Sequence, residues 1–343
     1  MVDIGSPTSS TNDILLTHNH IAILYSDAKR EYFPTEQQYI TEEEVFHRSQ
    51  IVAKYLEKFG IKVTLLPGNE ASVKHLEKSQ VDLVINLVDS IRGQEDLAAV
   101  IPAALELINV PYTGSGIMGM AVNSNKFLTK MMLFQNGVPV PHFQLFNTPS
   151  DPLDYQLRFP LIVKLNEIHG SVEIGEDSVV DNEKDLRKKI DSLMKVYKQS
   201  VLVEEFVVGR ELTVLIFEGI LKKVYPGERI FQNGGKYKIV TFDAAWGPQA
   251  KYSYDKYPLD ENLKGYIKKA FDVLKMDDYA RFDIRVDEAG RYYFIDANAN
   301  PALGPIESDC AFGTLLSLYN VAFDDVLKRL IINTIKGFNG QNP

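Results

Sequence analysis

The N-terminal part of the chain alternates apolar runs with amphipathic segments. Continuous apolar runs, which are typical of strands buried on both faces of a parallel sheet, occur at 21–25, 61–66 and 81–88. Helical periodicity lies between these runs, at 41–60 and 70–78. This order predicts a small doubly wound parallel sheet. Ligands of such sheets bind beyond the carboxyl ends of the strands, so the loops of interest are 26–44 and 89–96.

The longer of the two predicted helices carries signals at both ends. Thr41 is the expected N-cap, and Glu44, three residues later, is its expected capping-box partner. Gly60 supplies the C-terminal stop. A role in capping this helix is therefore sufficient to explain Glu44 without a functional one.

Strands dominate the pattern from residue 160 to residue 221. An apolar strand ends at Lys164, and a loop containing glycine and serine leads to a second strand at 178–180. An amphipathic helix at 182–197 precedes two further strands on either side of Gly209. A loop of this kind lays backbone N–H groups over phosphates, and Lys164 faces it. The alternative is an edge lysine whose charged end reaches solvent.

A strand pair near the C-terminus concentrates charged residues. Alternation along its first strand places three charged side chains on one face: Arg281, Asp283 and Arg285. Alternation along the return strand groups four residues on one face: Tyr292, Phe294, Asp296 and Asn298. A turn centred on Glu288 and Ala289 brings the two faces together.

This hairpin predicts a cation site. Two carboxylates and an amide oxygen, from Asp283, Asp296 and Asn298, are expected to converge beside Arg281. Burial of unpaired carboxylates is costly, and all-oxygen ligands select a hard ion such as Mg²⁺ or Mn²⁺. The alternative is a solvated hairpin in which an arginine pairs with an aspartate.

Charge and composition narrow the class of protein. The 343 residues include 37 Lys and Arg against 46 Asp and Glu, a net charge of −9. This balance argues against a broad surface for nucleic acid or anionic membrane. The single cysteine, Cys310, excludes an internal disulfide and fits a reducing cytoplasm. No apolar run approaches the roughly 20 residues that span a bilayer, and residues 1–17 are expected to form a flexible tail.

Several segments together resemble the D-alanine:D-alanine ligase group of ATP-grasp ligases. They follow one another in family order: NLVDSIRGQEDLAAVIPAALELINVPYTGSG, NSNKFLTKMMLFQNGVPVP, FPLIVK, VEEFVVGRELTV and RFDIRVDEAGRYYFIDANANP. The resemblance implies an α/β (α+β) ATP-grasp fold, in which an N-terminal doubly wound parallel sheet is followed by two ATP-grasp subdomains. The expected boundaries are 18–125 for the N-terminal domain, 126–207 for the central subdomain and 208–343 for the C-terminal subdomain.

The resemblance also implies roles for individual residues. The phosphate-binding lysines are Lys126 and Lys164. The hinge that reads adenine is Glu204, Glu205, Phe206 and Val207, and the ribose-binding acid is Glu211. The Mg²⁺ (or Mn²⁺) ligands are Asp283, Asp296 and Asn298. The catalytic residues are Arg281, for an oxyanion or the substrate carboxylate, Ser171 in the glycine-rich loop, and Glu42 for a substrate ammonium, with Glu44 as the alternative to Glu42.

Departures from the family pattern concern the substrate. Glu173 stands in the glycine-rich loop where a small residue is expected, and Ala245 and Trp246 replace the usual lysine and tyrosine of a flexible loop, which leaves Lys251 as a substitute. Glu307 is expected beside the second substrate, where it disfavours a carboxylate.

The expected function is that of an ATP-dependent carboxylate–amine ligase. It would act through an acyl phosphate on an amino acid or small peptide, with small-molecule substrates as its partners. The alternative is a degenerate ATP-grasp protein that binds nucleotide without ligating. The resemblance also suggests a homodimer through the N-terminal domain.

Overall fold

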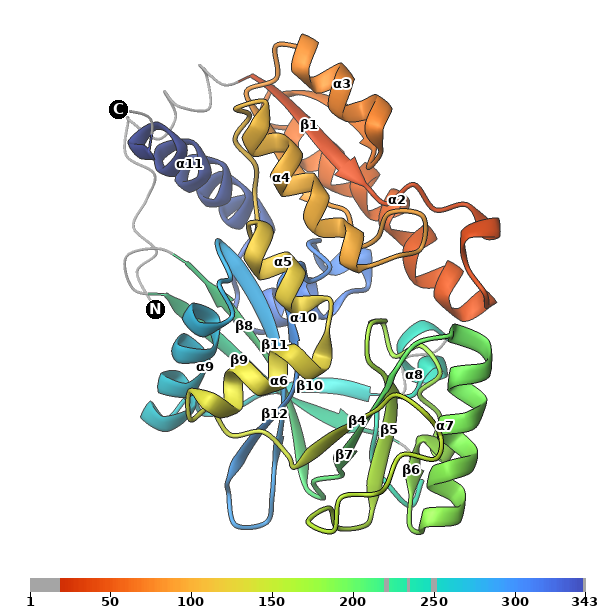
Figure 1. The fold of residues 1–343 in the computed structure, drawn as a ribbon. Helices are drawn as coiled ribbons and strands as arrows, with labels where there is room; N and C mark the ends of the chain where they lie inside the picture. Colours follow the sequence, from red (N-terminus) through yellow and green to blue (C-terminus); the bar gives the residue numbers. More distant parts are fainter. Residues whose placement is uncertain (1–18, 219–221, 233–234, 248–251, 342–343) are drawn as a thin grey trace.

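Three β-sheets follow one another along the chain in a computed structural model that describes residues 19–218, 222–232, 235–247 and 252–341 (Figure 1). The predicted tail at 1–17 and Lys251 lie outside the described residues. The boundaries at 125/126 and 207/208 stay predictions.

The N-terminal sheet is parallel, with the strand order β2-β1-β3. Its strands and the first two α-helices are β1 (His20–Tyr25), α2 (Glu36–Glu57), β2 (Lys62–Pro67), α3 (Glu70–Lys78) and β3 (Leu83–Leu87). The predicted parallel sheet is therefore confirmed. Strand β1 pairs in register with both neighbours, for example Ile23 with Leu65 and with Ile85, and β1 and β3 are the buried strands of the sheet.

Helix α2 begins earlier than the pattern predicts. Its N-cap is Thr35, whose side chain accepts a hydrogen bond from Gln38 N. Thr41, the predicted cap, lies inside the helix and donates to Gln38 O at 2.8 Å. The prediction was wrong because the first turns are polar and carry no apolar periodicity. Gly60 does follow the end of the helix, with φ +78°.

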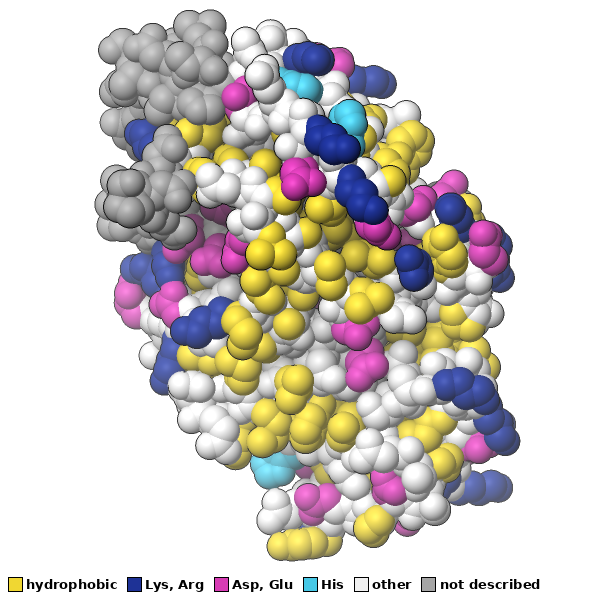
Figure 2. Space-filling view, turned by 45° about the horizontal axis from the view of Figure 1, so that its top comes forward, with side chains coloured by type: hydrophobic (Ala, Val, Ile, Leu, Met, Phe, Trp, Pro, Cys, Tyr) yellow, Lys and Arg dark blue, Asp and Glu magenta, His cyan; other side chains and the backbone are white. Residues whose placement is uncertain are grey.

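Helices α4 (Val100–Leu107), α5 (Ile117–Asn123) and α6 (Lys126–Gln135) lead from the first sheet to the second. Hydrophobic side chains gather on the face that these helices share (Figure 2). The most exposed among them are Leu107, Met118 and Phe134.

The second sheet is four-stranded and antiparallel, with the order β4-β7-β5-β6. Its elements are β4 (Phe143–Phe146), β5 (Leu161–Leu165), β6 (Val179–Val180), α7 (Glu183–Tyr197) and β7 (Val201–Glu205). Asn182 caps α7 by accepting from Asp185 N, and Leu186, Ile190 and Leu193 pack into the core of this sheet. The strands and helix predicted for this segment are confirmed.

The third sheet has five antiparallel strands in the order β10-β9-β8-β11-β12. Its elements are β8 (Arg210–Phe217), β9 (Lys223–Phe231), α8 (Phe242–Trp246), β10 (Tyr252–Lys256), α9 (Glu261–Val273), β11 (Tyr279–Val286), β12 (Tyr292–Asn298), α10 (Ala311–Leu318) and α11 (Phe323–Gln341). Helices α10 and α11 pack against the N-terminal sheet, since Leu315, Leu327 and Ile331 share a core with Ile23 and Ile85. Within the described ranges, no helix combines the length and the apolar character that a membrane crossing requires.

A β-bulge in the last hairpin changes which side chains share a face. Asp283 pairs with Asp296, but Ile284 pairs with Phe294, so Ile295 is an extra residue in β12. Phe294 therefore packs against Phe282 in the core, with ring centroids 5.5 Å apart. The predicted common face of Tyr292 and Phe294 with Asp296 and Asn298 was wrong, because a bulge reverses the alternation where it occurs.

Candidate active site

A pocket of about 830 Å³ lies between the two antiparallel sheets, and we call it the inter-sheet pocket. It is lined by the predicted nucleotide residues, namely Lys126, Lys164, Ser171, Glu204, Glu205, Phe206, Val207, Glu211, Asp283 and Asp296. Residues far apart in the sequence thus meet in one cavity. Arg281 and Asn298 do not line this pocket and belong to the second one described below.

Glu204 is fully buried at the base of the inter-sheet pocket between two lysines. Its carboxylate oxygens lie 2.9 Å from Lys164 Nζ and 3.1 Å from Lys130 Nζ, as ion pairs rather than well-aligned hydrogen bonds. Burial lowers the pKa of Lys130 to about 8, against the opposing effect of Glu204. Lys130 was not predicted, because on α6 it reads as an ordinary helix lysine.

A second buried ion-pair group surrounds Glu211. Arg285 Nη1 donates to Glu211 Oε2 at 2.8 Å, and Arg229 pairs with the other carboxylate oxygen. Arg285 also donates to Val207 O and lies over the Phe206 ring, 4.7 Å from its centroid. The hinge after β7 is therefore fixed to the third sheet. Arg229 was not predicted as a site residue, although its spacing on β9 faces it toward Glu211.

Both lysines of the predicted phosphate site point into the space beneath the loop at 166–175. Lys126 is buried, and its Nζ donates to Ile168 O at 2.6 Å. Burial holds the pKa of Lys126 below its ordinary value. Lys164 Nζ donates to Ile295 O at 3.2 Å, at the bulge. Lys164 is thus an inward-facing lysine and not an edge lysine reaching solvent.

The hairpin aligns the predicted metal ligands. Asp283 and Asp296 are cross-strand partners, and Asn298 faces Arg281 in the next pair. Burial alone would raise the pKa of Asp296, but Lys126, His169, Lys164 and Arg281 hold it below its ordinary value. Asn298 Nδ2 is buried without a hydrogen-bond partner among the described residues.

The donor set at this hairpin fits a hard divalent cation. Two carboxylates and one amide supply only oxygen ligands, which suits Mg²⁺ completed by water and phosphate. Across the described ranges, no group of three or more His, Cys, Asp or Glu side chains is placed to hold a metal. Asp283 already contacts Arg281 Nη2 at 3.1 Å and Thr213 Oγ1 at 2.8 Å. An ion would therefore need phosphate oxygens to bind tightly here.

The glycine-rich loop is fastened to helix α2. Glu173 points away from the inter-sheet pocket, and its Oε1 accepts from Tyr197 OH at 2.9 Å. Tyr197 OH lies 2.7 Å from Thr35 Oγ1, and Glu173 N donates to Gln37 Oε1 at 2.8 Å. The expected repulsion between Glu173 and phosphates is thereby avoided. Ser171, with φ +57°, remains in the pocket wall.

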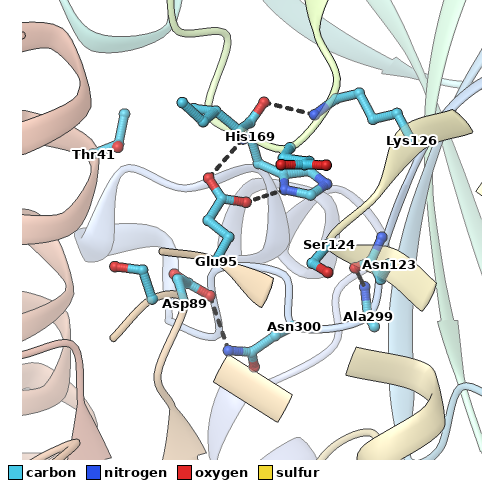
Figure 3. A network of polar contacts seen from close by, with 12 residues as sticks. Thr41, Asp89, Glu95, Asn123, Ser124, Lys126, His169, Ala299 and Asn300 are labelled. Atoms are coloured by element: carbon cyan, nitrogen blue, oxygen red, sulfur yellow. Dashed lines mark hydrogen bonds and ion pairs between the residues drawn. The ribbon is translucent and has the colours of Figure 1, made fainter. Parts of the chain in front are cut away.

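A second cavity, which we call the junction pocket, lies where the N-terminal sheet, the hairpin and the loop meet. Its ionisable lining residues are Glu42, Arg48, Asp89, Glu95, His169 and Arg281. Figure 3 shows Glu95 reaching both the main chain and the ring of His169, and Asp89 paired with Asn300. Asp89 and Glu95 follow the carboxyl end of β3, as the fold rule for such sheets anticipates, whereas Glu42 comes from α2.

Glu42 is the buried acid of the junction pocket. Its side chain is 4% exposed, and Oε2 has no hydrogen-bond partner among the described residues. Burial first, then the charges of Asp89 and Glu95, raise the pKa of Glu42 to about 8. Glu44, the alternative to Glu42, forms an ion pair with Arg48 and does not line the pocket.

Two residues that depart from the family pattern do not lie where the sequence predicted them. Glu307 lines a separate surface hollow and accepts from Tyr55 OH at 3.0 Å, so it does not face the junction pocket. Trp246 does line that pocket, and its Nε1 donates to Gly170 O at 2.8 Å. Asp89, Glu95 and His169 were not predicted as site residues, although 89–96 was marked as a ligand loop.

The paired sheets, the lysine-lined pocket between them and the polar pocket beside it define the chain as an ATP-grasp protein. A profile of the family described as D-ala D-ala ligase C-terminus matches residues 132–332, more than half of the chain. The chain belongs to this family. Its membership and the predicted ATP-grasp fold are therefore confirmed.

Known relatives span nearly the same length as this chain. An uncharacterized protein, y4sG, of Sinorhizobium fredii is 26% identical, covering 83% of this chain and 89% of the relative. D-alanine--D-alanine ligase B of Chromobacterium violaceum is 28% identical, covering 74% and 81%. The solved D-alanine--D-alanine ligase of Bacillus anthracis complexed with ATP has a TM-score of 0.71 at 17% identity, covering 94% of this chain and 99% of that one.

These findings make the protein an ATP-dependent, ADP-forming ligase that forms an amide bond between small molecules. The alternative of a degenerate nucleotide-binding protein is not favoured. Of the two residues that motivated that alternative, Glu173 and Ala245, Glu173 turns away from the inter-sheet pocket.

Proposed function

We propose that the protein activates the carboxylate of an amino acid or small peptide as an acyl phosphate and transfers the acyl group to an amine. ATP would bind in the inter-sheet pocket, and the amino-acid donor would bind in the junction pocket. The observation that carries the proposal is that the two cavities share a wall at His169 and Gly170. A donor carboxylate and a terminal phosphate would meet there.

Charge placement supports this division of roles. Lys126 and Lys164 would hold the phosphates, while the hinge from Glu204 to Val207 would face adenine and Glu211 the ribose. Because the Glu204 carboxylate is engaged by Lys130 and Lys164, the main chain of the hinge is the better partner for adenine. Phosphoryl transfer needs mainly alignment and charge neutralisation, which these groups provide.

Asp283, Asp296 and Asn298 would hold Mg²⁺ or Mn²⁺. When bound, the ion would neutralise phosphate charge and orient the phosphoryl group. The oxygen-only donor set and the low pKa of Asp296 support this role. Asp283 is already in contact with Arg281 and Thr213, which supports a site completed only when nucleotide phosphates are present.

Arg281 and Glu42 would act on the donor. Arg281 lines the junction pocket with an unpartnered Nε among the described residues, and would stabilise the oxyanion or hold the donor carboxylate. Glu42 would pair with the donor ammonium, whose positive charge favours the ionised form of the acid. Ser171 would donate to a phosphate from the loop.

The test is phosphate release from MgATP across a panel of D- and L-amino acids and dipeptides, offered singly and in pairs. At least one donor and acceptor pair should stimulate release and yield an amide detectable by mass spectrometry, and omission of Mg²⁺ should abolish both. Absence of stimulation by every pair would contradict the proposal.

A further inference from the structure

His169 occupies the wall between the two pockets and is held there from several sides. Its main-chain N donates to Glu95 Oε1 at 2.8 Å. The next residue, Gly170, has φ +72°, and a Cβ there would lie 2.8 Å from Thr41 Cγ2. Gly170 O also accepts from Trp246. The main chain at 169–170 is therefore held by Glu95, by close packing against α2 and by Trp246 of α8.

The Glu95 carboxylate also determines which ring nitrogen of His169 carries the proton. One of its oxygens accepts from the main chain of His169, and the other contacts ring Nδ1 (Figure 3). An accepting carboxylate places the ring proton on Nδ1 and leaves the lone pair on Nε2. His169 Nε2 is buried and has no hydrogen-bond partner among the described residues.

Further charged groups surround His169. Asp89, from the loop after β3, and Asp296, from β12, act electrostatically on the ring, but neither forms an ion pair with it. The ammonium of Lys126, on α6, donates to the carbonyl of Ile168. Where the two cavities meet, the imidazole thus presents Nε2 without a hydrogen-bond partner among the described residues. Its other nitrogen, Nδ1, contacts the Glu95 carboxylate.

We propose that His169 is the general base for the acceptor amine, an inference that rests on the proposed ligase function. Nε2 takes a proton from the acceptor ammonium, and the freed lone pair forms the C–N bond to the acyl phosphate. The carbon–oxygen bond to phosphate then breaks as the nitrogen gives its second proton to the departing phosphate, which leaves as hydrogen phosphate, and the imidazolium passes its proton to water. Glu95 is a positioning residue that holds the tautomer.

The test compares two acceptors in the His169→Asn variant. An amino-acid acceptor arrives as an ammonium and needs a base, whereas hydroxylamine is uncharged at neutral pH and needs none. We expect the rate with the amino acid to fall about 100-fold or more, while hydroxamate formation with hydroxylamine changes less than about threefold. The acid limb of the wild-type pH profile, measured with the amino acid, should disappear.

Glu95→Gln provides a second variant that keeps the shape of the pair. Its amide N–H faces ring Nδ1, which moves the ring proton to Nε2 and removes the base. The same selective loss with the amino-acid acceptor is expected. His47→Asn, on the exposed face of α2, is the matched control and should leave both rates unchanged.

Equal losses with both acceptors, or a raised KM for ATP as the main effect in His169→Asn, would overturn the general-base role and indicate a structural or phosphate-binding one. A retained amino-acid rate would overturn it too. If wild-type protein forms neither amide nor hydroxamate with any donor, the proposed function itself fails, and the role of His169 fails with it.

Discussion

The inter-sheet pocket and the junction pocket share a wall but differ in whether their buried acids have cationic partners. In the inter-sheet pocket each buried acid is matched by two cations, since Glu204 lies between two lysines and Glu211 between two arginines. In the junction pocket Glu42 is buried without a cationic partner and keeps its proton up to about pH 8.

The difference indicates which charge each cavity favours in its ligand. A pocket with its charges already matched keeps its shape without a ligand and receives one that brings its own counter-ion, as ATP with a divalent cation does. A pocket with an unmatched acid gains most from a cationic ligand, such as the ammonium of an amino acid. Four predictions test this contrast, in order of expected size.

Lys130→Met should have the largest effect, because it leaves Glu204 with a single cation in the core. The free energy of unfolding should fall by about 3 to 5 kcal/mol, measured by urea denaturation. The double variant Lys130→Met/Glu204→Gln should recover much of this loss. A loss of under about 1 kcal/mol, the size typical of a surface pair, would contradict the matched-charge description of the inter-sheet pocket.

Arg281→Ala should reduce turnover by about 100-fold, equivalent to about 3 kcal/mol of transition-state stabilisation. MgATP affinity, measured by calorimetry, should change little, because Arg281 lines the junction pocket and not the inter-sheet pocket. Arg291→Ala, at the exposed turn of the same hairpin, is the control. Equal losses of turnover and of nucleotide binding would refute the assignment of Arg281 to the junction pocket chemistry.

Glu42→Gln should change how stability depends on pH. Between its ordinary pKa of 4.5 and about 8, the unfolded chain releases the Glu42 proton while the folded chain keeps it, so the free energy of unfolding falls as pH rises. The variant should therefore gain about 1 to 3 kcal/mol relative to wild type between pH 5 and pH 8, measured by urea denaturation. Glu43→Gln, exposed on the same helix, should show no such gain. A difference that is constant with pH would show that Glu42 is ionised in the folded protein.

Tyr197→Phe should have the smallest effect, since it removes only the hydroxyl between Thr35 and Glu173. We expect a loss of about 1 kcal/mol in the free energy of unfolding and a change of less than about fivefold in the KM for ATP. Tyr155→Phe, at an exposed position, serves for comparison. An unchanged stability would mean that the loop is not held through this hydroxyl.

The two pockets also differ in how far the sequence predicts them. Strands supply much of the inter-sheet pocket. An apolar run that ends in a lysine indicates Lys164, and the family resemblance indicates Glu204. The partners that match their charges, Lys130 and Arg229, were missed because a lysine on a helix or an arginine on a strand carries no local signal. Only the tertiary fold brings them to the buried acids.

The junction pocket is less predictable because its lining residues come from segments scattered along the chain, from Thr41 to Ala302. Glu42 was identified through family resemblance, but local pattern assigned the neighbouring Glu44 to a cap that lies at Thr35 instead. His169 reads as a loop residue until Glu95, distant in sequence, is placed beside it. Glu307, which comparison with the family pattern placed beside the second substrate, lies outside both pockets and accepts from Tyr55 OH.

The bulge at Ile295 has a consequence for how this hairpin tolerates change over evolution. The extra residue separates β12 into a part that packs with the core, through Tyr292 and Phe294, and a part that faces the pockets, through Asp296 and Asn298. Substitutions in one part therefore need no compensation in the other. Loss of the single residue Ile295, by contrast, would exchange the two faces, so insertions and deletions should be far rarer here than substitutions.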